Sequence, residues 1–208
     1  MTKLLELKNI SKTFPGVKAL QNVNLDLEAG EVLGLCGENG AGKSTLMKIL
    51  TGIYTADPGG EIWLEGRQVV VGGVNHAREL GLSIIHQELN MVPDLTVAQN
   101  LYLGRQGSHR AGWINDSKLN REAAELFERL GMNLDPAARI GDLSVARQQM
   151  VEIARALSYN SRILVMDEPT AALTVGETEA LFGMIRDFIT PETGLIYISH
   201  RMPEIEEI

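Results

Sequence analysis

The chain has 208 residues, a net charge of −8 and 44% hydrophobic residues, enough material for one substantial hydrophobic core. It contains no uninterrupted apolar stretch of roughly 20 residues and no evident signal peptide, so a membrane-spanning helix is not expected. The acidic balance argues against a general nucleic-acid surface, and no nucleic-acid partner is expected. The single cysteine, Cys36, rules out a disulfide within the chain, and its place in an apolar run predicts a buried thiol.

The N-terminal section, through about Val71, is predicted to be rich in strands. One strand is expected over residues 61–65, before a turn at Gly66 and Arg67. A second apolar segment, residues 32–35, directly precedes a glycine-rich run. This order of strand and glycine-rich loop is the context that a phosphate-binding loop requires.

The glycine-rich run from Gly37 to Thr45 fits the pattern G-x-x-x-x-G-K-[ST]. Its glycines permit a tight turn whose backbone N–H groups converge on a triphosphate, and a helix beginning at Lys43 directs the positive end of its dipole to the same point. Lys43 adds a mobile cation. Apolar residues then recur at helical spacing, and Gly52 suits the end of this helix. A glycine-rich turn without a ligand is the alternative reading.

The middle of the chain is predicted to be largely helical. One amphipathic face of a helix that ends at Gly131 is marked by Leu119, Ala123, Leu126, Phe127 and Leu130. The histidines of this part and its flanks show no metal-ligand spacing, so no metal is assigned to histidine.

Two buried parallel strands are predicted near the end of the chain, and each ends in polar residues. Residues 162–166 lead into Asp167 and Glu168, and residues 195–198 lead into Ser199 and His200. Strand ends of a parallel sheet meet at one edge, so Asp167 is expected to face magnesium, Glu168 a water molecule, and His200 the transferred phosphate. The alternatives are an exposed acidic turn and a structural histidine.

With these motifs in sequence order, the chain resembles the ATP-binding subunits of ABC transporters over essentially its whole length. The resemblance implies that Phe14 stacks on adenine, although a core phenylalanine is the alternative. It places Gln87 where a glutamine contacts magnesium and the attacking water. It also assigns residues 143–149, Leu-Ser-Val-Ala-Arg-Gln-Gln, to the signature motif, with Ser144 capping the following helix.

The chain departs from the family pattern at two places. The signature motif normally has a second glycine where this chain has Ala146, whose Cβ hinders close backbone approach to a γ-phosphate. The segment after Thr170 lacks the usual aspartate, which puts communication between sites in doubt. Thr174 and Glu177 nevertheless form a predicted capping box at the start of a helix.

The motif variants at residues 37–48, 87–90, 150–157 and 167–174 look like bacterial monosaccharide importers of the ribose, galactose and xylose type. In that subfamily the subunit is usually a tandem of two such domains. Residues 1–208 therefore look like one nucleotide-binding domain, truncated at its C-terminus, with a helical insertion at about residues 90–158. The implied fold is α/β, a P-loop NTPase of the ABC type with a RecA-like, mainly parallel sheet and an N-terminal antiparallel section.

The resemblance implies an ATPase that powers sugar import from the cytoplasmic face of the bacterial inner membrane, as a peripheral subunit. Its implied partners are ATP with Mg²⁺, a second nucleotide-binding domain, transmembrane permease subunits and, indirectly, a sugar-binding protein. The implied catalytic residues are Glu168, His200 and Gln87. The implied magnesium ligands are Ser44, Gln87 and Asp167. The remaining implied contacts with ATP are Phe14, Gly37, Glu38, Asn39, Gly40, Ala41, Gly42, Lys43, Ser44 and Thr45, and those with the partner's ATP are Ser144, Val145, Ala146 and Arg147.

Three other functions remain open at this point. A translation-associated or DNA-repair ABC ATPase would share the phosphate motifs, but the linker or long heptad insertion that each requires does not occur in these residues. A nucleotide-binding module without turnover would fit the altered signature, whereas Glu168 and His200 argue for hydrolysis. A P-loop kinase would need an acceptor site, and none is evident.

Overall fold

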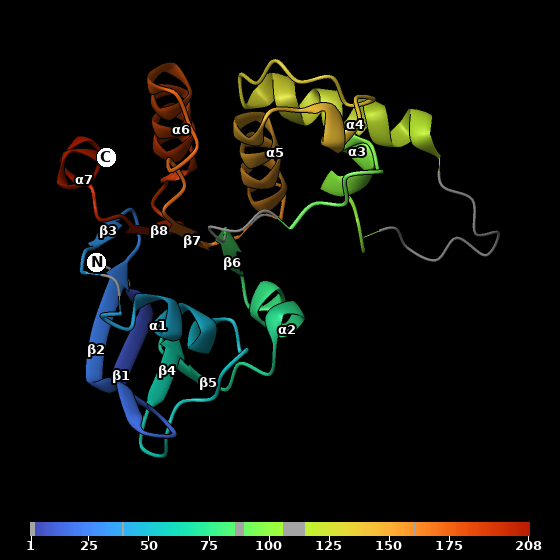
Figure 1. The fold of residues 1–208 in the computed structure, drawn as a ribbon. Helices are drawn as coiled ribbons and strands as arrows, with labels where there is room; N and C mark the ends of the chain where they lie inside the picture. Colours follow the sequence, from blue (N-terminus) through green and yellow to red (C-terminus); the bar gives the residue numbers. More distant parts are fainter. Residues whose placement is uncertain (1–2, 39, 86–89, 106–114, 160) are drawn as a thin grey trace. The chain divides into compact units, whose positions relative to one another are not determined.

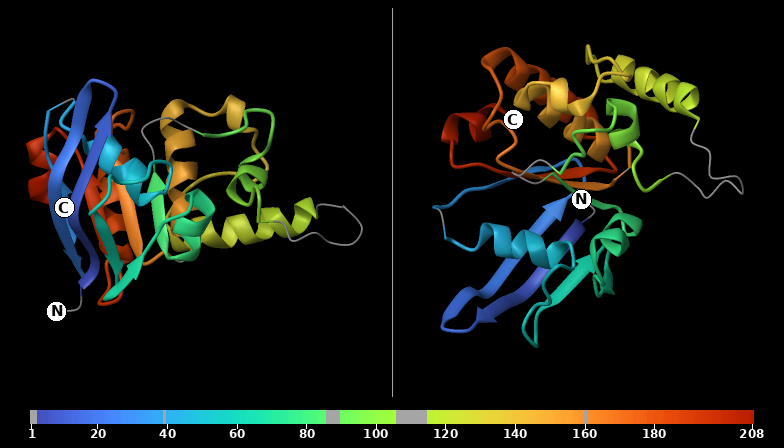
Figure 2. Two further views of the ribbon diagram at one scale, coloured as in Figure 1. Left: turned by 90° about the horizontal axis from the view of Figure 1, so that it is seen from below. Right: turned by 45° about the vertical axis from the view of Figure 1, so that its right-hand side comes forward.

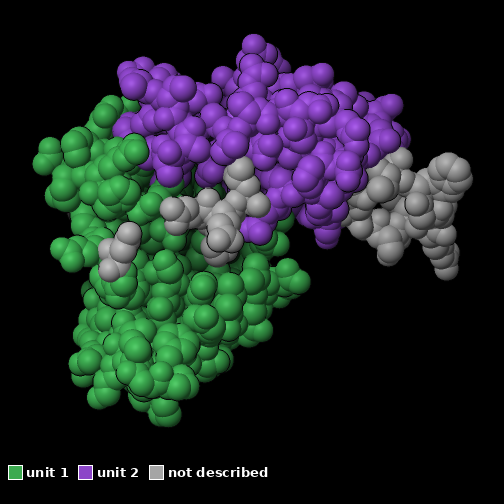
Figure 3. Space-filling model, viewed as in Figure 1, with its two compact units in different colours: residues 1–86, 159–168, 185–208 green, residues 87–158, 169–184 purple. Residues whose placement is uncertain are grey.

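The computed structural model describes residues 3–38, 40–85, 90–105, 115–159 and 161–208. Asn39 and Gln87, two of the predicted site residues, lie outside the described residues. The chain divides into two compact units (Figure 3). Unit 1 comprises residues 1–86, 159–168 and 185–208, and unit 2 comprises residues 87–158 and 169–184.

Unit 1 contains an antiparallel sheet with the strand order β2-β1-β4-β5. Its strands are β1 (Lys3–Phe14), β2 (Val17–Glu28), β4 (Glu61–Leu64) and β5 (Arg67–Val69). The β1–β2 hairpin closes where Phe14 pairs with Val17, and Gly16 in the turn has a φ of 81° that glycine adopts without a Cβ clash. The strand-rich N-terminal section predicted from the sequence is therefore confirmed.

The second sheet of unit 1 is parallel, with the order β3-β8-β7-β6. Its strands are β3 (Val32–Leu35), β6 (Leu82–Ile85), β7 (Ile163–Asp167) and β8 (Gly194–Ile198). All five residues of β8 and the first four of β7 are buried. Strands covered on both faces require continuous apolar runs, which explains why these segments lack the alternation of a half-exposed strand.

Helix α1 (Lys43–Leu50) completes the core of unit 1. Leu46, Met47, Ile49 and Leu50 are buried in one cluster that includes side chains of both sheets, and α1 runs beside the antiparallel sheet (Figures 1 and 2). Gly52 ends the helix as predicted, with a φ of 70°. A Cβ there would lie 2.4 Å from the backbone nitrogen of Gly73, so close packing also requires glycine.

Three further helices are α2 (Val74–Glu79), α6 (Val175–Phe188) and α7 (Met202–Glu207). The predicted capping box at the start of α6 is confirmed. The backbone N–H of Thr174 donates to Glu177 at 2.9 Å, and the backbone N–H of Glu177 donates to the Thr174 hydroxyl at 3.4 Å.

A separate core in unit 2 is formed by α3 (Val97–Leu101), α4 (Asp116–Arg129), the short 3-10 helix η1 (Ile140–Asp142) and α5 (Val145–Leu157). Residues 175–184 of α6 also belong to unit 2. The predicted apolar face of α4 is buried in this core, and the helix ends just before Gly131, which has a φ of 64°.

The prediction of a buried Cys36 is wrong, because the thiol follows β3 at the outer edge of the parallel sheet and is exposed. Within the described part of the chain, no helix combines the length and apolar character needed to span a membrane.

Candidate functional site

The register of the parallel sheet brings the predicted site segments to one edge. Ile198 of β8 pairs with Leu35 of β3 on one side and with Asp167 of β7 on the other. The residues that follow these three positions therefore leave neighbouring strands at the same carboxyl edge. This edge is where ligands bind in open α/β sheets.

The phosphate loop connects β3 to α1 and has the backbone that its glycines predict. Gly40 and Gly42 have φ angles of 87° and 94°. A Cβ on Gly42 would lie 2.6 Å from the carbonyl oxygen of Ala19, so no larger residue fits there. Ala41 donates its N–H to the Glu38 carbonyl at 3.2 Å, which closes the turn.

The loop ends at a helix terminus suited to an anion. Lys43 is the first residue of α1, its N-cap Gly42 provides no side-chain hydrogen bond, and the first turn holds no acidic residue. Ser44 is exposed and Thr45 half-buried on that turn. Backbone N–H groups and the helix dipole at such a terminus favour phosphate.

Lys43 closes the phosphate loop through two hydrogen bonds of its side chain. Its ammonium donates to the Gly37 carbonyl at 2.6 Å and to the Glu38 carbonyl at 3.0 Å. Phosphate oxygens carry negative charge and accept stronger hydrogen bonds than neutral carbonyls do. A bound triphosphate can therefore draw the ammonium from these carbonyls onto its own oxygens.

Glu168 and His200 meet beyond the ends of β7 and β8. His200 Nδ1 lies 2.9 Å from Glu168 Oε1, and a histidine with its proton on Nδ1 donates this hydrogen bond. The backbone of Glu168 is left-handed, with a φ of 48°, and its N–H donates to the Ile198 carbonyl at 2.9 Å. This conformation is uncommon for a residue with a Cβ, and surrounding contacts must hold it.

The side chains of this pair differ in their exposure. Glu168 is 16% exposed, whereas His200 is 59% exposed and accessible to a ligand. A partly desolvated carboxylate oriented by a histidine can accept a proton from water. The exposed imidazole can at the same time contact a phosphate oxygen.

Asp167 and Ser44 are the described candidates for magnesium. Asp167 ends β7 and is half-buried, and Ser44 lies on the exposed first turn of α1. Carboxylate and hydroxyl oxygens fit a hard divalent cation, which commonly takes its other ligands from phosphate and water. The described residues contain no group of three His, Cys, Asp or Glu side chains that could hold a metal on its own.

Phe14 lies at the end of β1, half-buried. Its ring meets Tyr54 edge to face, with centroids 5.2 Å apart and planes at 71°, and the Lys12 ammonium lies 5.6 Å from its centroid. One face of an aromatic ring is enough for stacking on a base. The role of Phe14 at adenine stays a prediction.

The signature segment belongs to unit 2. The Ser144 hydroxyl accepts a hydrogen bond from the Arg147 N–H at 3.4 Å and caps α5, as predicted. Ser144, Val145 and Arg147 are exposed, and Ala146 is half-buried. The backbone and side-chain hydrogen bonds from Thr174 lower the pKa of Glu177, and the charge of Arg147 acts in the same direction.

Two carboxylates have contacts that sequence reasoning did not single out. Glu204 on α7 accepts hydrogen bonds from residues on both sides of His200. Glu152 on α5 is buried, and its Oε2 has no hydrogen-bond partner among the described residues. Glu204 lies outside the motifs, and the segment 150–157 contains Glu152 without indicating a role for it. Helical spacing alone does not reveal a contact across the fold.

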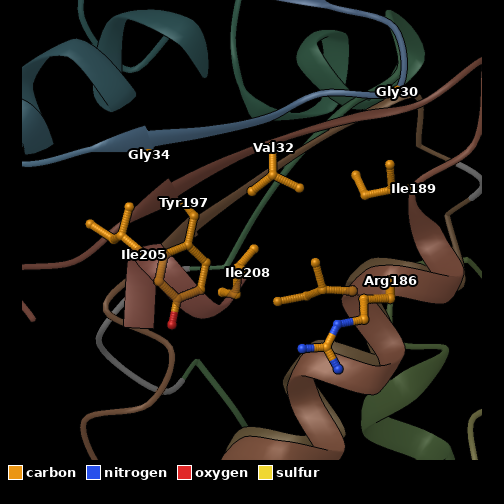
Figure 4. A pocket seen from close by; sticks show the side chains of 9 residues that line it. Gly30, Val32, Gly34, Arg186, Ile189, Tyr197, Ile205 and Ile208 are labelled. Carbon is orange, nitrogen blue, oxygen red and sulfur yellow. The ribbon is translucent and has the colours of Figure 1, made fainter. Parts of the chain in front are cut away.

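A separate pocket of about 400 Å³ lies in unit 1 (Figure 4). It is lined by Gly30, Val32, Gly34, Ile185, Arg186, Ile189, Tyr197, Ile205 and Ile208. None of these residues belongs to the phosphate loop or to the Glu168–His200 pair. The pocket is therefore distinct from the candidate site.

The chain was compared with known proteins. The model of the ABC transporter family matches residues 20–171. A putative ribose/galactose/methyl galactoside import ATP-binding protein of Albidiferax ferrireducens is 54% identical over all of this chain and 41% of its own length. A protein of the same description from Geobacillus kaustophilus is 51% identical over 99% of this chain and 41% of its own length. The chain thus spans about two fifths of these relatives.

The chain is also similar in fold to solved structures of ATP-binding cassettes. An ATP-binding cassette of an ABC transporter in its ADP conformation is 27% identical, with a TM-score of 0.85 over 100% of this chain and 85% of its own. A nucleotide-free cassette gives the same identity and TM-score over 98% and 84%. The predicted P-loop fold of the ABC type is confirmed, and the chain belongs to the ABC transporter family.

Proposed function

We propose that this chain is a nucleotide-binding domain that binds and hydrolyses ATP to power the import of a sugar. The observation that carries the hydrolytic part is the contact of Glu168 with His200 at the sheet edge from which the phosphate loop also emerges. A module that only held nucleotide would not need this carboxylate and imidazole.

Binding is assigned to the loop, to Lys43 and to Phe14. The loop N–H groups and the start of α1 surround the β- and γ-phosphates, and Lys43 exchanges its carbonyl partners for phosphate oxygens. Phe14 offers a ring face to adenine, beside the contact that it already makes with Tyr54.

Hydrolysis is in-line attack of water on the γ-phosphorus. Glu168 accepts a proton from that water as the new P–O bond forms and the bond to the ADP oxygen breaks. His200 orients Glu168 and contacts the γ-phosphate. Ser44, Asp167 and Gln87 would hold Mg²⁺, which neutralises phosphate charge when bound. Most of the rate enhancement then comes from positioning and electrostatic stabilisation.

The proposed assembly includes a second nucleotide-binding domain. In this arrangement, residues 144–147 serve the ATP of the partner domain, and the partner's signature segment completes the site of Lys43 and Glu168. The helical insertion, about residues 90–158, would pack near permease subunits. Closure around ATP and reopening after hydrolysis would then drive the permease between its access states.

Sugar import is proposed because the relatives that match the whole chain are described as ribose/galactose/methyl galactoside import ATP-binding proteins. The proposal places the domain at the cytoplasmic face of the bacterial inner membrane, attached through permease subunits. A sugar-binding protein would deliver the cargo on the other side.

The test uses the protein at its natural length together with its permease. Phosphate release from ATP is measured with and without sugar and its binding protein, and labelled sugar uptake is measured in parallel. ATP-dependent uptake supports the proposal. Phosphate release without uptake of any monosaccharide would contradict the transport assignment, and phosphoryl transfer to an acceptor instead of water would contradict hydrolysis.

A further inference from the structure

The carboxylate of Glu204 accepts hydrogen bonds from three residues of the segment that carries His200. Its Oε2 accepts from the Tyr197 hydroxyl at 3.2 Å and from the Ser199 hydroxyl at 3.1 Å. Its Oε1 accepts from the Arg201 guanidinium at 3.1 Å. The side chain of Glu204 is only 12% exposed, so these bonds are largely shielded from water.

The Ser199 hydroxyl links Glu204 to the backbone beyond His200. The Ser199 hydroxyl donates its proton to Oε2 of Glu204. The lone pairs of the same hydroxyl then face the other way, and one accepts the Arg201 N–H at 3.0 Å. This bond closes a tight turn whose central residue is His200.

Glu168, the partner of His200 in the site, is held in place by the parallel sheet. Asp167 pairs with Ile198, and the Glu168 N–H donates to the Ile198 carbonyl at 2.9 Å. Glu168 is thereby fixed to β8, whereas His200 lies beyond the last sheet pairing. The exposed His200 side chain therefore depends on the turn between Ser199 and Arg201 for its direction.

We infer that Glu204 is a positioning residue for hydrolysis, because it fixes the Ser199 hydroxyl and through it the turn that directs His200 at Glu168. This inference rests on the proposed function. It adds a residue that lies outside the motifs assigned to nucleotide binding and hydrolysis. A misplacement of about 1 Å can lower a rate on the order of 100-fold, so a lost turn is expected to affect the chemical step.

The experiment compares Glu204→Ala with Glu204→Gln and with the control Glu206→Ala in the protein at its natural length. Glu206 lies on the same helix, is exposed, and lies outside the proposed machinery. ATP affinity is measured by direct titration, kcat by phosphate release, and the turn by hydrogen exchange of the Arg201 amide. Glu168→Gln is assayed in parallel as a test of the proposed function itself.

Glu204→Ala is expected to lower kcat by about 10- to 100-fold while the Kd for ATP changes by less than about threefold. Arg201 amide exchange should become faster in the same variant. Glu204→Gln keeps a carbonyl oxygen for the two hydroxyls and should retain most of the activity. Glu206→Ala should match the wild type in all three measurements.

Ser199→Ala provides a second variant, which keeps the Glu204 carboxylate and removes only the hydroxyl that connects it to the Arg201 N–H. It should lower kcat to a similar extent, and the double variant should lose little more, because both changes break one chain of contacts. An unchanged kcat and unchanged Arg201 exchange in Glu204→Ala would overturn the inference. If Glu168→Gln also left hydrolysis intact, the proposed function would fail instead, and the Arg201 exchange would still decide the role of Glu204.

Discussion

Glu168 and His200 lie 32 positions apart in the sequence, yet their side chains meet at 2.9 Å. The pairing of Asp167 with Ile198 explains this contact, because each strand continues directly into one of the two site residues. The contact thus follows from the register of two buried strands. A slip of the register would separate a proposed base from the imidazole that orients it.

Replacing Lys43 by alanine is expected to weaken ATP binding by about 1.5–3 kcal/mol, which is roughly 10- to 100-fold in Kd. The substitution removes a charge-assisted contact to phosphate, while the loop N–H groups remain. Direct titration with ATP measures the change. Lys118→Ala is the control, because Lys118 is exposed on α4 and pairs only with Glu122 among the described salt bridges. Equal affinity of wild type and Lys43→Ala would contradict the phosphate contact.

Ala146→Gly is expected to speed hydrolysis at the ATP site that the signature segment is proposed to serve, by up to about tenfold. Removal of the Cβ lets the backbone approach a γ-phosphate more closely. Because Ala146 lies in the first turn of α5, glycine should also cost about 1 kcal/mol of helix stability. Single-turnover rates of the two sites in the natural-length protein measure the effect, with Ala124→Gly as control. Two sites that are equally fast before the change would contradict the predicted asymmetry.

The capping box of α6 should give a pH-dependent contribution to stability. Hydrogen bonds from Thr174 lower the folded-state pKa of Glu177 below 4.5. Its stabilisation is therefore present above the unfolded pKa and is lost as pH falls through the folded pKa. Thr174→Ala should lower the free energy of unfolding by about 0.5–2 kcal/mol near neutral pH. Urea denaturation from about pH 7 to pH 3 should show the effect of Glu177→Ala shrinking, and a constant effect would refute it.

The contribution of Glu152 to stability should depend on pH in the opposite direction. Burial raises its pKa above 4.5, while the Arg155 guanidinium and the Asn90 N–H lower it in part. A raised folded-state pKa means that its contribution is fully present below the unfolded pKa and is lost as pH rises through the folded pKa. Glu152→Gln should therefore gain stability relative to wild type as pH rises from about 4 to 8, measured by urea denaturation. A difference that stays constant over this range would contradict the burial argument.

The sequence predicts those parts of the fold that depend on residues close together in the chain. The phosphate loop, the stop at Gly52, the capping box at Thr174 and the buried strands before Glu168 and His200 each depend on residues close together in the chain. Their patterns reflect backbone conformation, helix capping or burial on both faces of a sheet, and each of these acts over a few residues. The structure confirms the helix stop, the capping box, the buried strands and the glycine backbone of the loop, and phosphate binding by the loop stays a prediction.

Other features depend on contacts between distant elements. An apolar run predicted a buried Cys36, but β3 is an outer strand of the parallel sheet and leaves the thiol exposed. The role of Glu204 requires β8 and α7 to place three donors around one carboxylate. No local pattern encodes such an arrangement, because it depends on tertiary packing.

The most direct test of the account is Glu168→Gln in the natural-length protein, with ATP titration and single-turnover phosphate release measured on the same sample. The amide keeps the shape of the carboxylate and cannot act as a base. ATP affinity should change by less than about threefold, while phosphate release should fall on the order of 100- to 10,000-fold. Glu206→Gln is the control and should match the wild type. Unchanged phosphate release, or loss of ATP binding, would contradict the assignment of Glu168 as the base.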